Sequence, residues 1–366
     1  MTTLAPLTGA DAAALTDLAS ELSQSEVIGL DTEFLRERTY RAQLCLLQLA
    51  TPTRCCLVDP IDNTHLSLLQ PALVAAQPVK VLHAARQDLE VLFPVFGTLV
   101  NVFDTQVAAA LAGLPAQVGY ADLVKRLLGL ELDKSHTRTD WSRRPLSAAQ
   151  LSYAAEDVRH LALLRQMLLE HLDKLGRVSW LEEELQGLVR GDNLFVDPDR
   201  AWERLKGIAE LDEDRQRLAR VLAAWRERRA VDRDRPRSWI LDDPGLRALI
   251  ARAPRDAAAL SQLPELAPGF IEHSGEEILA LINTAQLPAA LPAMPGRTRP
   301  DADASARLKK LSAVVSERAA ALGIGSEILA TRRDLEQVAG GNAGAAPLRG
   351  WRRAAIGDAL LAALRD

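Results

Sequence analysis

The amino-acid sequence predicts an α/β domain at the beginning of the chain and an all-helical part after it. Three observations predict this organisation: short apolar runs alternate with helical patterns over about the first 195 residues, the strand pattern then disappears, and a proline-rich stretch divides the remainder. Strands mixed with helices are typical of a mostly buried sheet covered by helices. With 366 residues, 48% of them hydrophobic, the chain is long enough for two or three domains with sizeable cores.

Four short runs rich in Val, Ile, Leu and Cys, bounded by Pro, Asp or Thr, are expected to form strands. They are Glu26–Leu30, Gln43–Ala50, Arg54–Val58 and Val79–His83. The three cysteines, Cys45, Cys55 and Cys56, lie in these runs, and neither their odd number nor their spacing matches a zinc or redox motif. We therefore expect buried free thiols.

Helices are expected between and after these strands, where apolar residues recur at helical spacing. The segments are Gln87–Phe96, Thr105–Leu111 and Tyr120–Leu128. A longer helix is expected to begin at Ser147, because Pro145 precedes it and Ser147 forms a capping-box pattern with Gln150. Gly176 is expected to end this helix.

Beyond residue 195 the pattern is helical. Residues 203–230 are expected to form one long amphipathic helix, and Ser274 with Glu277 is expected to cap another, before the apolar run Ile278–Ile282. Prolines punctuate the short segments between them: Pro236, Pro244, Pro254, Pro264 and Pro268. The stretch Leu287–Pro300 is typical of a linker, and a second helical unit follows from about Ser305.

The two helical units share a pattern, since each begins with a long charged helix and ends with an apolar one, as in a weak internal repeat. We expect three domains, at residues 1–195, 203–286 and 300–366.

The charge distribution gives mixed indications about partners. A net charge of −5 argues mildly against nucleic acid, but phosphate contacts need only a local basic surface. Two basic stretches exist, and on the pattern alone each is more often a solvated face than a binding site. They comprise Lys134, Arg138, Arg143 and Arg144, and then Arg226, Arg228, Arg229, Arg233, Arg235 and Arg237.

A membrane or secreted location is not expected. No apolar run reaches the roughly 18 residues that a membrane span needs. The first ten residues have neither the basic flank nor the apolar core of a signal peptide. We therefore expect a cytoplasmic protein with no membrane partner.

The most informative segment is the buried strand that runs into Asp31 and Glu33. Because the two residues are two apart, an extended chain places both side chains on one face. Two such carboxylates repel each other unless a cation lies between them, and their oxygens suit Mg²⁺ or Mn²⁺. The alternative is a strand end at which both charges are simply solvated.

Further acidic residues follow at positions that suggest a shared site. Asp88 lies near the start of a predicted helix, where an anion is favoured even without a catalytic role. Tyr153 and Asp157 are four apart and therefore share one helix face, where they could also form a surface hydrogen-bond pair.

Together these residues resemble the three motifs of the DEDD exonuclease superfamily. The motifs are Asp31-Thr32-Glu33, then Asp88 within His83-x4-Asp88-Leu89, then Tyr153-x3-Asp157. The match is to the Tyr-bearing subclass, because the position at which the other subclass carries His is Ser152. The segments Phe103–Gln106, Asp140–Leu146 and Gln150–Val158 are similar to the ribonuclease D family, and the two helical units resemble its HRDC modules.

The resemblance implies an RNase H-like domain with a mixed sheet flanked by helices, followed by two small all-α HRDC-like domains. It implies a 3′→5′ exoribonuclease that uses two divalent metal ions, Mg²⁺ or Mn²⁺, and releases nucleoside 5′-monophosphates. By this analogy Asp31 bridges both ions, Glu33 and Asp157 hold the ion that activates water, Asp88 holds the other, and Tyr153 positions the water.

Four further residues are candidates for substrate binding. Phe34 is expected either to pack against the terminal base or sugar or to belong to the core. His83 is either a site residue or a core histidine. Trp141 and Arg144 either bind phosphate and shape the substrate entrance or are structural. Asp104 is expected to cap a helix.

The expected partner is RNA with a single-stranded 3′ end, with tRNA precursors as the substrate that the family implies, and the chain is expected to be a monomer. Two alternatives stay open: a DNA 3′→5′ exonuclease with the same metal chemistry, and a non-catalytic RNA-binding scaffold. Deleting the residues from about 295 onward is expected to weaken binding more than chemistry.

Overall fold

The structure is a computed structural model, and it describes residues 6–61, 63–133, 139–189, 194–284 and 302–365. The described residues fall into two compact units. Unit 1 comprises those within Met1–Leu35, Gln43–Leu194 and Ala302–Asp366, and unit 2 those within Arg36–Ala42 and Phe195–Asp301. Each unit is considered by itself below.

A five-stranded mixed sheet forms the centre of unit 1, in the order β3-β2-β1-β4-β5. The strands are β1 Val27–Leu35, β2 Gln43–Ala50, β3 Cys55–Val58, β4 Val79–Leu82 and β5 Val102–Asp104. β1 pairs antiparallel with β2 and parallel with β4. All four predicted strands are confirmed, but β1 extends five residues further than Leu30 and so includes the acidic pair. The cysteines are free thiols on β2 and β3, and two of them are buried.

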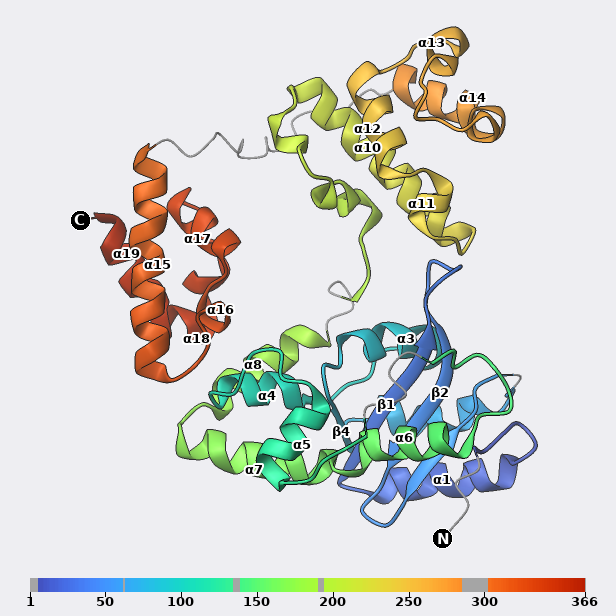
Figure 1. Cartoon of the computed structure of the whole chain (residues 1–366), viewed down its shortest axis with the longest axis vertical. Helices are drawn as coiled ribbons and strands as arrows, with labels where there is room; N and C mark the ends of the chain where they lie inside the picture. Colours follow the sequence, from blue (N-terminus) through green and yellow to red (C-terminus); the bar gives the residue numbers. More distant parts are fainter. Residues whose placement is uncertain (1–5, 62, 134–138, 190–193, 285–301, 366) are drawn as a thin grey trace. The chain divides into compact units, whose positions relative to one another are not determined.

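Helices cover both faces of the sheet (Figure 1). α6 (Ala148–Arg159) packs on β1, β2 and β3, and α7 (Leu161–Lys174) packs on β1 and β4. α3 (Arg86–Phe96) contacts the opposite face of β1. The side chain of Thr32 on β1 points away from α6 and is hydrogen-bonded to Asp88 in the first turn of α3. The remaining helices of the domain are α1 Ala12–Gln24, α2 Gln70–Val74, α4 Thr105–Leu111, α5 Tyr120–Leu128 and α8 Val178–Leu188, with the 3₁₀ turn η1 Leu66–Leu69.

Gly29 allows the close approach of α6 to the sheet. A Cβ atom at this position would lie 2.8 Å from the carbonyl oxygen of Val158 and 3.4 Å from Leu161. Real Cβ atoms do not come so near an oxygen, so a larger residue would push the helix away. The glycine therefore fixes the distance between β1, which carries Asp31, and the helix that carries Asp157.

The prediction of one continuous helix from Ser147 to Gly176 is wrong, because the helix breaks at His160. Ser147 begins α6 with the predicted capping box to Gln150. At the break, the hydroxyl of Tyr120 donates to the carbonyl of Glu156 (2.9 Å) and accepts from the backbone N–H of His160 (3.3 Å). It replaces the hydrogen bond that would continue the helix, and a new helix, α7, begins at Leu161.

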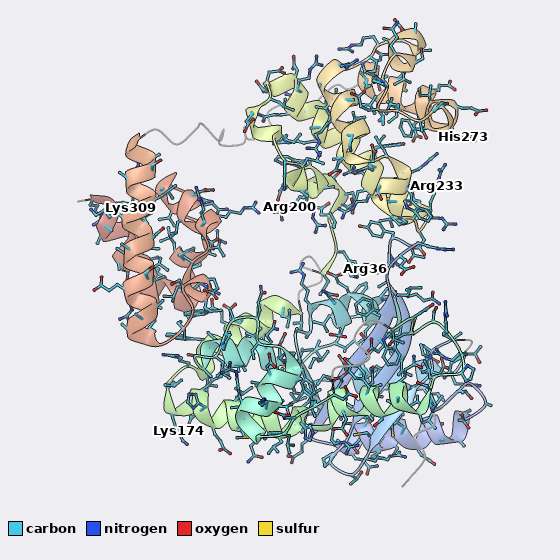
Figure 2. All side chains as sticks on the ribbon, viewed as in Figure 1. Arg36, Lys174, Arg200, Arg233, His273 and Lys309 are labelled. Atoms are coloured by element: carbon cyan, nitrogen blue, oxygen red, sulfur yellow. The ribbon has the colours of Figure 1, made fainter. Side chains whose placement is uncertain are left out.

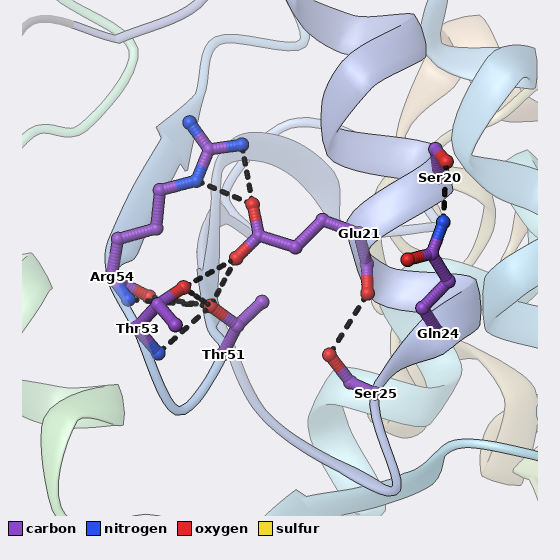
Figure 3. A network of polar contacts seen from close by, with 7 residues as sticks. All are labelled: Ser20, Glu21, Gln24, Ser25, Thr51, Thr53 and Arg54. Atoms are coloured by element: carbon purple, nitrogen blue, oxygen red, sulfur yellow. Dashed lines mark hydrogen bonds and ion pairs between the residues drawn. The ribbon is translucent and has the colours of Figure 1, made fainter.

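α1 is not among the elements predicted from the sequence. Its inner face is fully buried, and its Glu21 closes the β2–β3 turn (Figure 3). The Glu21 carboxylate accepts from Thr51 (2.5 Å), Thr53 (2.7 Å) and Arg54 (2.7 Å). This network stabilises the edge of the sheet on the β3 side.

The C-terminal helices share a hydrophobic core with the sheet domain, so unit 1 contains both. The indole of Trp351 stacks on Trp180 of α8, with ring centroids 4.4 Å apart, and donates to Glu184 (2.7 Å). Arg352 forms an ion pair with Glu184. The elements are α15 Ala302–Leu322, α16 Ser326–Leu329, α17 Arg332–Ala339, η4 Ala346–Leu348, α18 Gly350–Arg352, the π-helical turn η5 Arg353–Gly357 and α19 Asp358–Arg365. Deleting them would uncover this core, so weaker binding would not be the only effect of the deletion.

Unit 2 is helical, and its first part corrects a prediction. Residues 203–230 do not form one helix. The turns η2 (Pro198–Arg204) and η3 (Ile208–Glu210) come first, with Gly207 at φ 81° between them. The helix α10 begins only at Glu213, because Asp212 caps it.

The other helices of unit 2 are α11 Arg237–Ile240, α12 Asp243–Arg252, α13 Ala257–Ser261 and α14 Pro268–Thr284. The prolines lie at or beside helix ends as predicted. Ser274 is not a cap: it is buried inside α14, which begins at Pro268, six residues earlier. The segment Arg36–Ala42 also belongs to this unit, since backbone N–H groups of Tyr40 and Arg41 both donate to Asp234 (3.1 Å each).

The linker predicted at Leu287–Pro300, and Lys134 and Arg138 of the first basic stretch, lie outside the described residues. Across the described ranges, the structure has no helix that combines the length and the apolar character needed to cross a membrane.

Candidate active site

The acidic pair lies on the central strand of unit 1. Asp31 is paired with Gln48 of β2, and Glu33 with Leu46. The register shifts directly after Glu33, so Phe34 is paired with Leu44 and the strand is bulged at this point. Gly29 has the same orientation on β1 as Asp31 and Glu33 and faces α6, so both carboxylates lie on the face that α6 covers.

Asp88 is presented by the first turn of α3, where it is only 6% exposed. The hydroxyl of Thr32, between the two acidic residues of β1, donates to the Asp88 carboxylate at 2.5 Å. The turn before α3 is strained, because Ala84 has a φ of 57°. Asp104 holds this turn by accepting from the backbone N–H groups of Ala84 (3.0 Å) and Ala85 (2.8 Å).

Asp104 was predicted to be a helix cap, and this is confirmed. Its carboxylate accepts from the backbone N–H groups of Gln106 (2.8 Å) and Val107 at the start of α4. Its second role, holding the turn that leads to Asp88, was not predicted, because it depends on the pairing of β4 with β5. The buried side chain of Asp104 therefore positions the start of both α3 and α4.

Tyr153 and Asp157 lie one turn apart on α6 and are hydrogen-bonded to each other through their side chains. The ring of Trp141 lies 6.2 Å from that of Tyr153 and is almost fully buried. The charge of Asp157 acts on both Asp31 and Glu33. The structure thus brings the five predicted motif residues together from β1, α3 and α6.

The pKa values of the four carboxyl groups are all raised. Burial raises the pKa of Asp31 well above its ordinary range, and the charges of Asp88, Asp157 and Glu33 raise it further. Burial, together with the charges of Asp157 and Asp88, raises the pKa of Glu33 to about 8. Burial raises the pKa of Asp88 and of Asp157 to about 7, although hydrogen bonds from Thr32 and Tyr153 oppose the shift. The site therefore gathers four acidic groups whose ionised forms are disfavoured by burial and by one another.

This donor set fits divalent metal ions of the Mg²⁺ or Mn²⁺ type, since it consists of carboxylate oxygens and carries excess negative charge. In their present positions, no three His, Cys, Asp or Glu side chains of the described residues form a group that could hold an ion. Burial is the largest cause of the raised pKa values, and a bound cation would lower them.

Gln48 is a residue of this region that the sequence did not single out. It is fully buried on β2 directly opposite Asp31, and cross-strand partners point to the same face. Neither its Nε2 nor its Oε1 has a hydrogen-bond partner among the described residues. A polar residue within the apolar run Gln43–Ala50 was the available signal. An amide left unpaired beside a carboxylate is a candidate for positioning Asp31.

The predicted substrate-binding residues have different environments. Phe34 is half-buried on β1. Both ring nitrogens of His83 are engaged, with the hydroxyl of Thr105 and the carbonyl of Val118 at 2.9 Å each, and burial lowers the pKa of this histidine. Arg144 forms an ion pair with Asp59 and donates to the carbonyl groups of Cys45 (2.7 Å) and Trp141 (2.8 Å). These bonds hold Trp141 beside Tyr153.

Comparisons with known proteins identify the family to which the chain is similar. A family model described as 3′-5′ exonuclease matches residues 8–173, and one described as HRDC domain matches residues 215–282. The chain is 40% identical to ribonuclease D of Gluconacetobacter diazotrophicus, with 96% of this chain and 91% of the relative covered. It is 38% identical to ribonuclease D of Nitrobacter hamburgensis, with 96% and 93% covered.

Solved structures also show similarity to enzymes of this kind. The chain is similar to the crystal structure of Escherichia coli RNase D, an exoribonuclease involved in structured RNA processing, with a TM-score of 0.87 and 30% identity. That comparison covers 100% of this chain and 99% of the other. The catalytic core of RRP6 from Trypanosoma brucei, at 24% identity and a TM-score of 0.58, shares the fold.

Proposed function

Because the chain belongs to the ribonuclease D family, we propose that Asp31, Glu33, Asp88, Tyr153 and Asp157 are the catalytic residues of its exonuclease reaction. The protein is a metal-dependent 3′→5′ exoribonuclease. One observation carries the assignment of residues: four carboxylates with raised pKa values converge from three separate elements. A purely structural cluster would have basic partners, because unpaired buried charges are costly.

Two divalent ions, Mg²⁺ or Mn²⁺, held by the four carboxylates would lower the pKa of a bound water and neutralise charge on the phosphodiester. In this proposal the protein belongs to the Tyr-bearing subclass, and Tyr153 is its characteristic residue. Burial and the charges of Asp157, Glu33 and Asp31 raise the pKa of its hydroxyl above the ordinary value, so it stays protonated at neutral pH. A protonated hydroxyl positions a water molecule by hydrogen bonding and does not act as a base. The product is a nucleoside 5′-monophosphate.

The second part of the proposal concerns how the substrate is held. Phe34 lies on the strand of the acidic pair and supports contact with the terminal base or sugar. Trp141 and Arg144 shape the entrance, because the bonds of Arg144 hold Trp141 against Tyr153. His83 supports the site through Thr105 rather than through substrate, since both its ring nitrogens are engaged.

The substrate is RNA, and we place tRNA precursors with a single-stranded 3′ end in this class. The E. coli relative's description as an enzyme of structured RNA processing supports this choice. We further propose that the enzyme acts as a monomer in the cytoplasm. Free rather than paired cysteines fit a reducing compartment.

We propose that residues 300–366 are a second, divergent HRDC module, after an exonuclease domain at 1–195 and a first module at 203–286. The order of elements supports this. The first long helix of each module, α10 or α15, has 20 or 21 residues and is followed by a four-residue helix, α11 or α16. A side-chain-capped helix, α12 and α17, then follows in both.

The test uses a 5′-labelled RNA with a single-stranded 3′ tail and its DNA counterpart, each with and without Mg²⁺ or Mn²⁺. We expect a metal-dependent ladder that shortens from the 3′ end of RNA. Equal shortening of DNA would indicate a general exonuclease, and binding without shortening would indicate a scaffold.

The residue assignment is tested in the same assay with Asp157→Asn. This variant should abolish turnover and leave the fold intact, because it removes a candidate ligand and no core contact. The matched control is Glu156→Gln, which removes the neighbouring carboxylate of α6, ion-paired to Arg159 and outside the proposed catalytic set. Full activity of Asp157→Asn, or equal loss in both variants, would contradict the assignment.

A further inference from the structure

Trp239 is unusually exposed for an aromatic residue. It lies on α11 in unit 2, and 59% of its surface is accessible, more than for any other large apolar side chain of the described residues. A single exposed apolar residue needs no explanation by itself. An indole, however, is a large flat surface that gains free energy when a partner covers it. The surroundings of Trp239 indicate what that partner is.

Arginine residues lie on two segments of unit 2 that are hydrogen-bonded to each other, and Figure 2 labels one arginine of each, Arg36 and Arg233. The guanidinium of Arg235 lies 5.9 Å from the centre of the Trp239 ring. The same guanidinium donates to the carbonyl of Arg38 at 3.3 Å, which ties the Arg36–Ala42 segment to the residues after α10. The hydrogen bonds from Tyr40 and Arg41 to Asp234 fix this arrangement.

Three of these arginines have exposed, positively charged side chains. Arg38, Arg41 and Arg233 are exposed, and within the described ranges their side chains form no ion pair. Among the nearby acids, Asp234 accepts from two backbone N–H groups, and the buried Glu227 is paired with Arg237 and bonded to Tyr40. Glu37 and Asp232 are further exposed acids on the same two segments. The surface therefore combines unpaired positive charge with an exposed aromatic ring.

We propose that this arginine–tryptophan surface, made of Arg38, Arg41, Arg233, Arg235 and Trp239, binds the single-stranded part of the RNA substrate. A base stacks on Trp239, and the arginines contact phosphates. Proteins that bind single strands without sequence preference combine these two features, since every base has an aromatic face and every phosphate a charge. The inference rests on the proposed action on RNA. It assigns these residues a role in binding RNA and not in the hydrolysis, because none of them is a carboxylate.

Binding is measured by fluorescence anisotropy with the full-length chain in EDTA, which prevents hydrolysis, and a 5′-labelled single-stranded RNA of about 12 nucleotides. Trp239→Ala should weaken binding at least about fivefold, the equivalent of ~1 kcal/mol of stacking. Trp239→Phe should retain most of the affinity, because it keeps a ring. The double variant Arg41→Ala/Arg233→Ala should lower the slope of log K against log salt by about 1.4, since each lost phosphate contact of a single strand accounts for about 0.7.

The matched control is Arg252→Ala, which removes an exposed arginine of α12 in the same unit and should change neither affinity nor slope beyond the general charge effect. In the exonuclease assay, Trp239→Ala should raise KM on the same RNA and leave kcat unchanged. Unchanged affinity of Trp239→Ala, or the same loss in Arg252→Ala as in the arginine double variant, would overturn the proposal. Failure of the proposed function is seen separately, as absence of nucleotide release by the unmodified protein.

Discussion

Replacing Gln48 with leucine is predicted to stabilise the fold and to reduce activity. The residue is fully buried, and both polar atoms of its amide lack partners among the described residues. Leaving a buried amide unpaired costs about 1–3 kcal/mol. Leucine has a similar size and no polar atoms, so Gln48→Leu should raise the free energy of unfolding by about this amount. For a domain of this size, each ~1 kcal/mol corresponds to a Tm increase of roughly 2–4 °C.

Activity should change in the opposite direction. A side chain that costs stability at a position opposite Asp31 is expected to be kept for the reaction, in which its amide would donate to the Asp31 carboxylate once that group is ionised in the metal-loaded site. Calorimetry of the metal-free protein gives the stability, and nucleotide release at saturating RNA gives kcat. Gln43→Leu is the control: it lies at the exposed start of the same strand and should alter stability by less than about 0.5 kcal/mol.

Two results would refute this reasoning. A lower Tm for Gln48→Leu would show that the amide is hydrogen-bonded in solution, either to Asp31 or through a buried water molecule. A higher Tm with full activity would show that the amide has no role in the reaction. In the first case Gln48 does not lower the stability of the fold. In the second case Gln48 does not contribute to catalysis.

Three further predictions concern the carboxylates and the packing that positions them. Because the folded-state pKa values are raised to about 7–8, the folded protein binds protons that the unfolded chain has already released. The thermal stability of the metal-free protein should therefore fall as pH rises from 5 to about 8, and Asp157→Asn should flatten this dependence; a Tm that rises over this range would contradict the shifts. Gly29→Ala should cost about 1–3 kcal/mol and lower kcat, since its Cβ would meet the Val158 carbonyl at 2.8 Å, whereas Gly187→Ala, with open space around it, should do neither. Trp351→Ala should destabilise unit 1 by about 3–5 kcal/mol in urea unfolding, and a loss below about 1 kcal/mol would show that the C-terminal helices do not share the core.

Local patterns predicted the elements whose stability is local. β2, α4 and α5 have the bounds expected from apolar spacing and flanking residues, and the capping box at Ser147 is present. The break at His160 was missed because its cause is not local: the hydroxyl that replaces the helix hydrogen bond comes from Tyr120, forty residues earlier. The late start of α10 was missed because charge periodicity continues through Gly207 and Asp212, which end the preceding turns and cap the helix.

The candidate site was likewise predicted only where it depends on local sequence. The spacing of Asp31 and Glu33 alone placed both on one face of a strand. That Asp88 and Asp157 approach them depends on how α3 and α6 pack on the sheet, which the residues alone did not show and which only the family resemblance implied. Gln48 was missed because, in a strand buried on both faces, one amide among apolar residues gives no sign of whether it is paired.

The carboxylate site lowers the stability of the fold, and three residues outside the site hold in place the elements that carry the carboxylates. The ionised carboxylates, of which Asp88 is buried and the other three are partly buried, repel one another across the elements that carry them. Gly29 holds α6 against β1, Tyr120 fixes the end of α6, and Asp104 fixes the strained turn before α3. None of these three residues is a candidate metal ligand, yet each sets the position of an element that presents one. Substitutions at these three positions should therefore impair catalysis through geometry, and a metal ion, by cancelling the repulsion, should restore part of the stability that they lose.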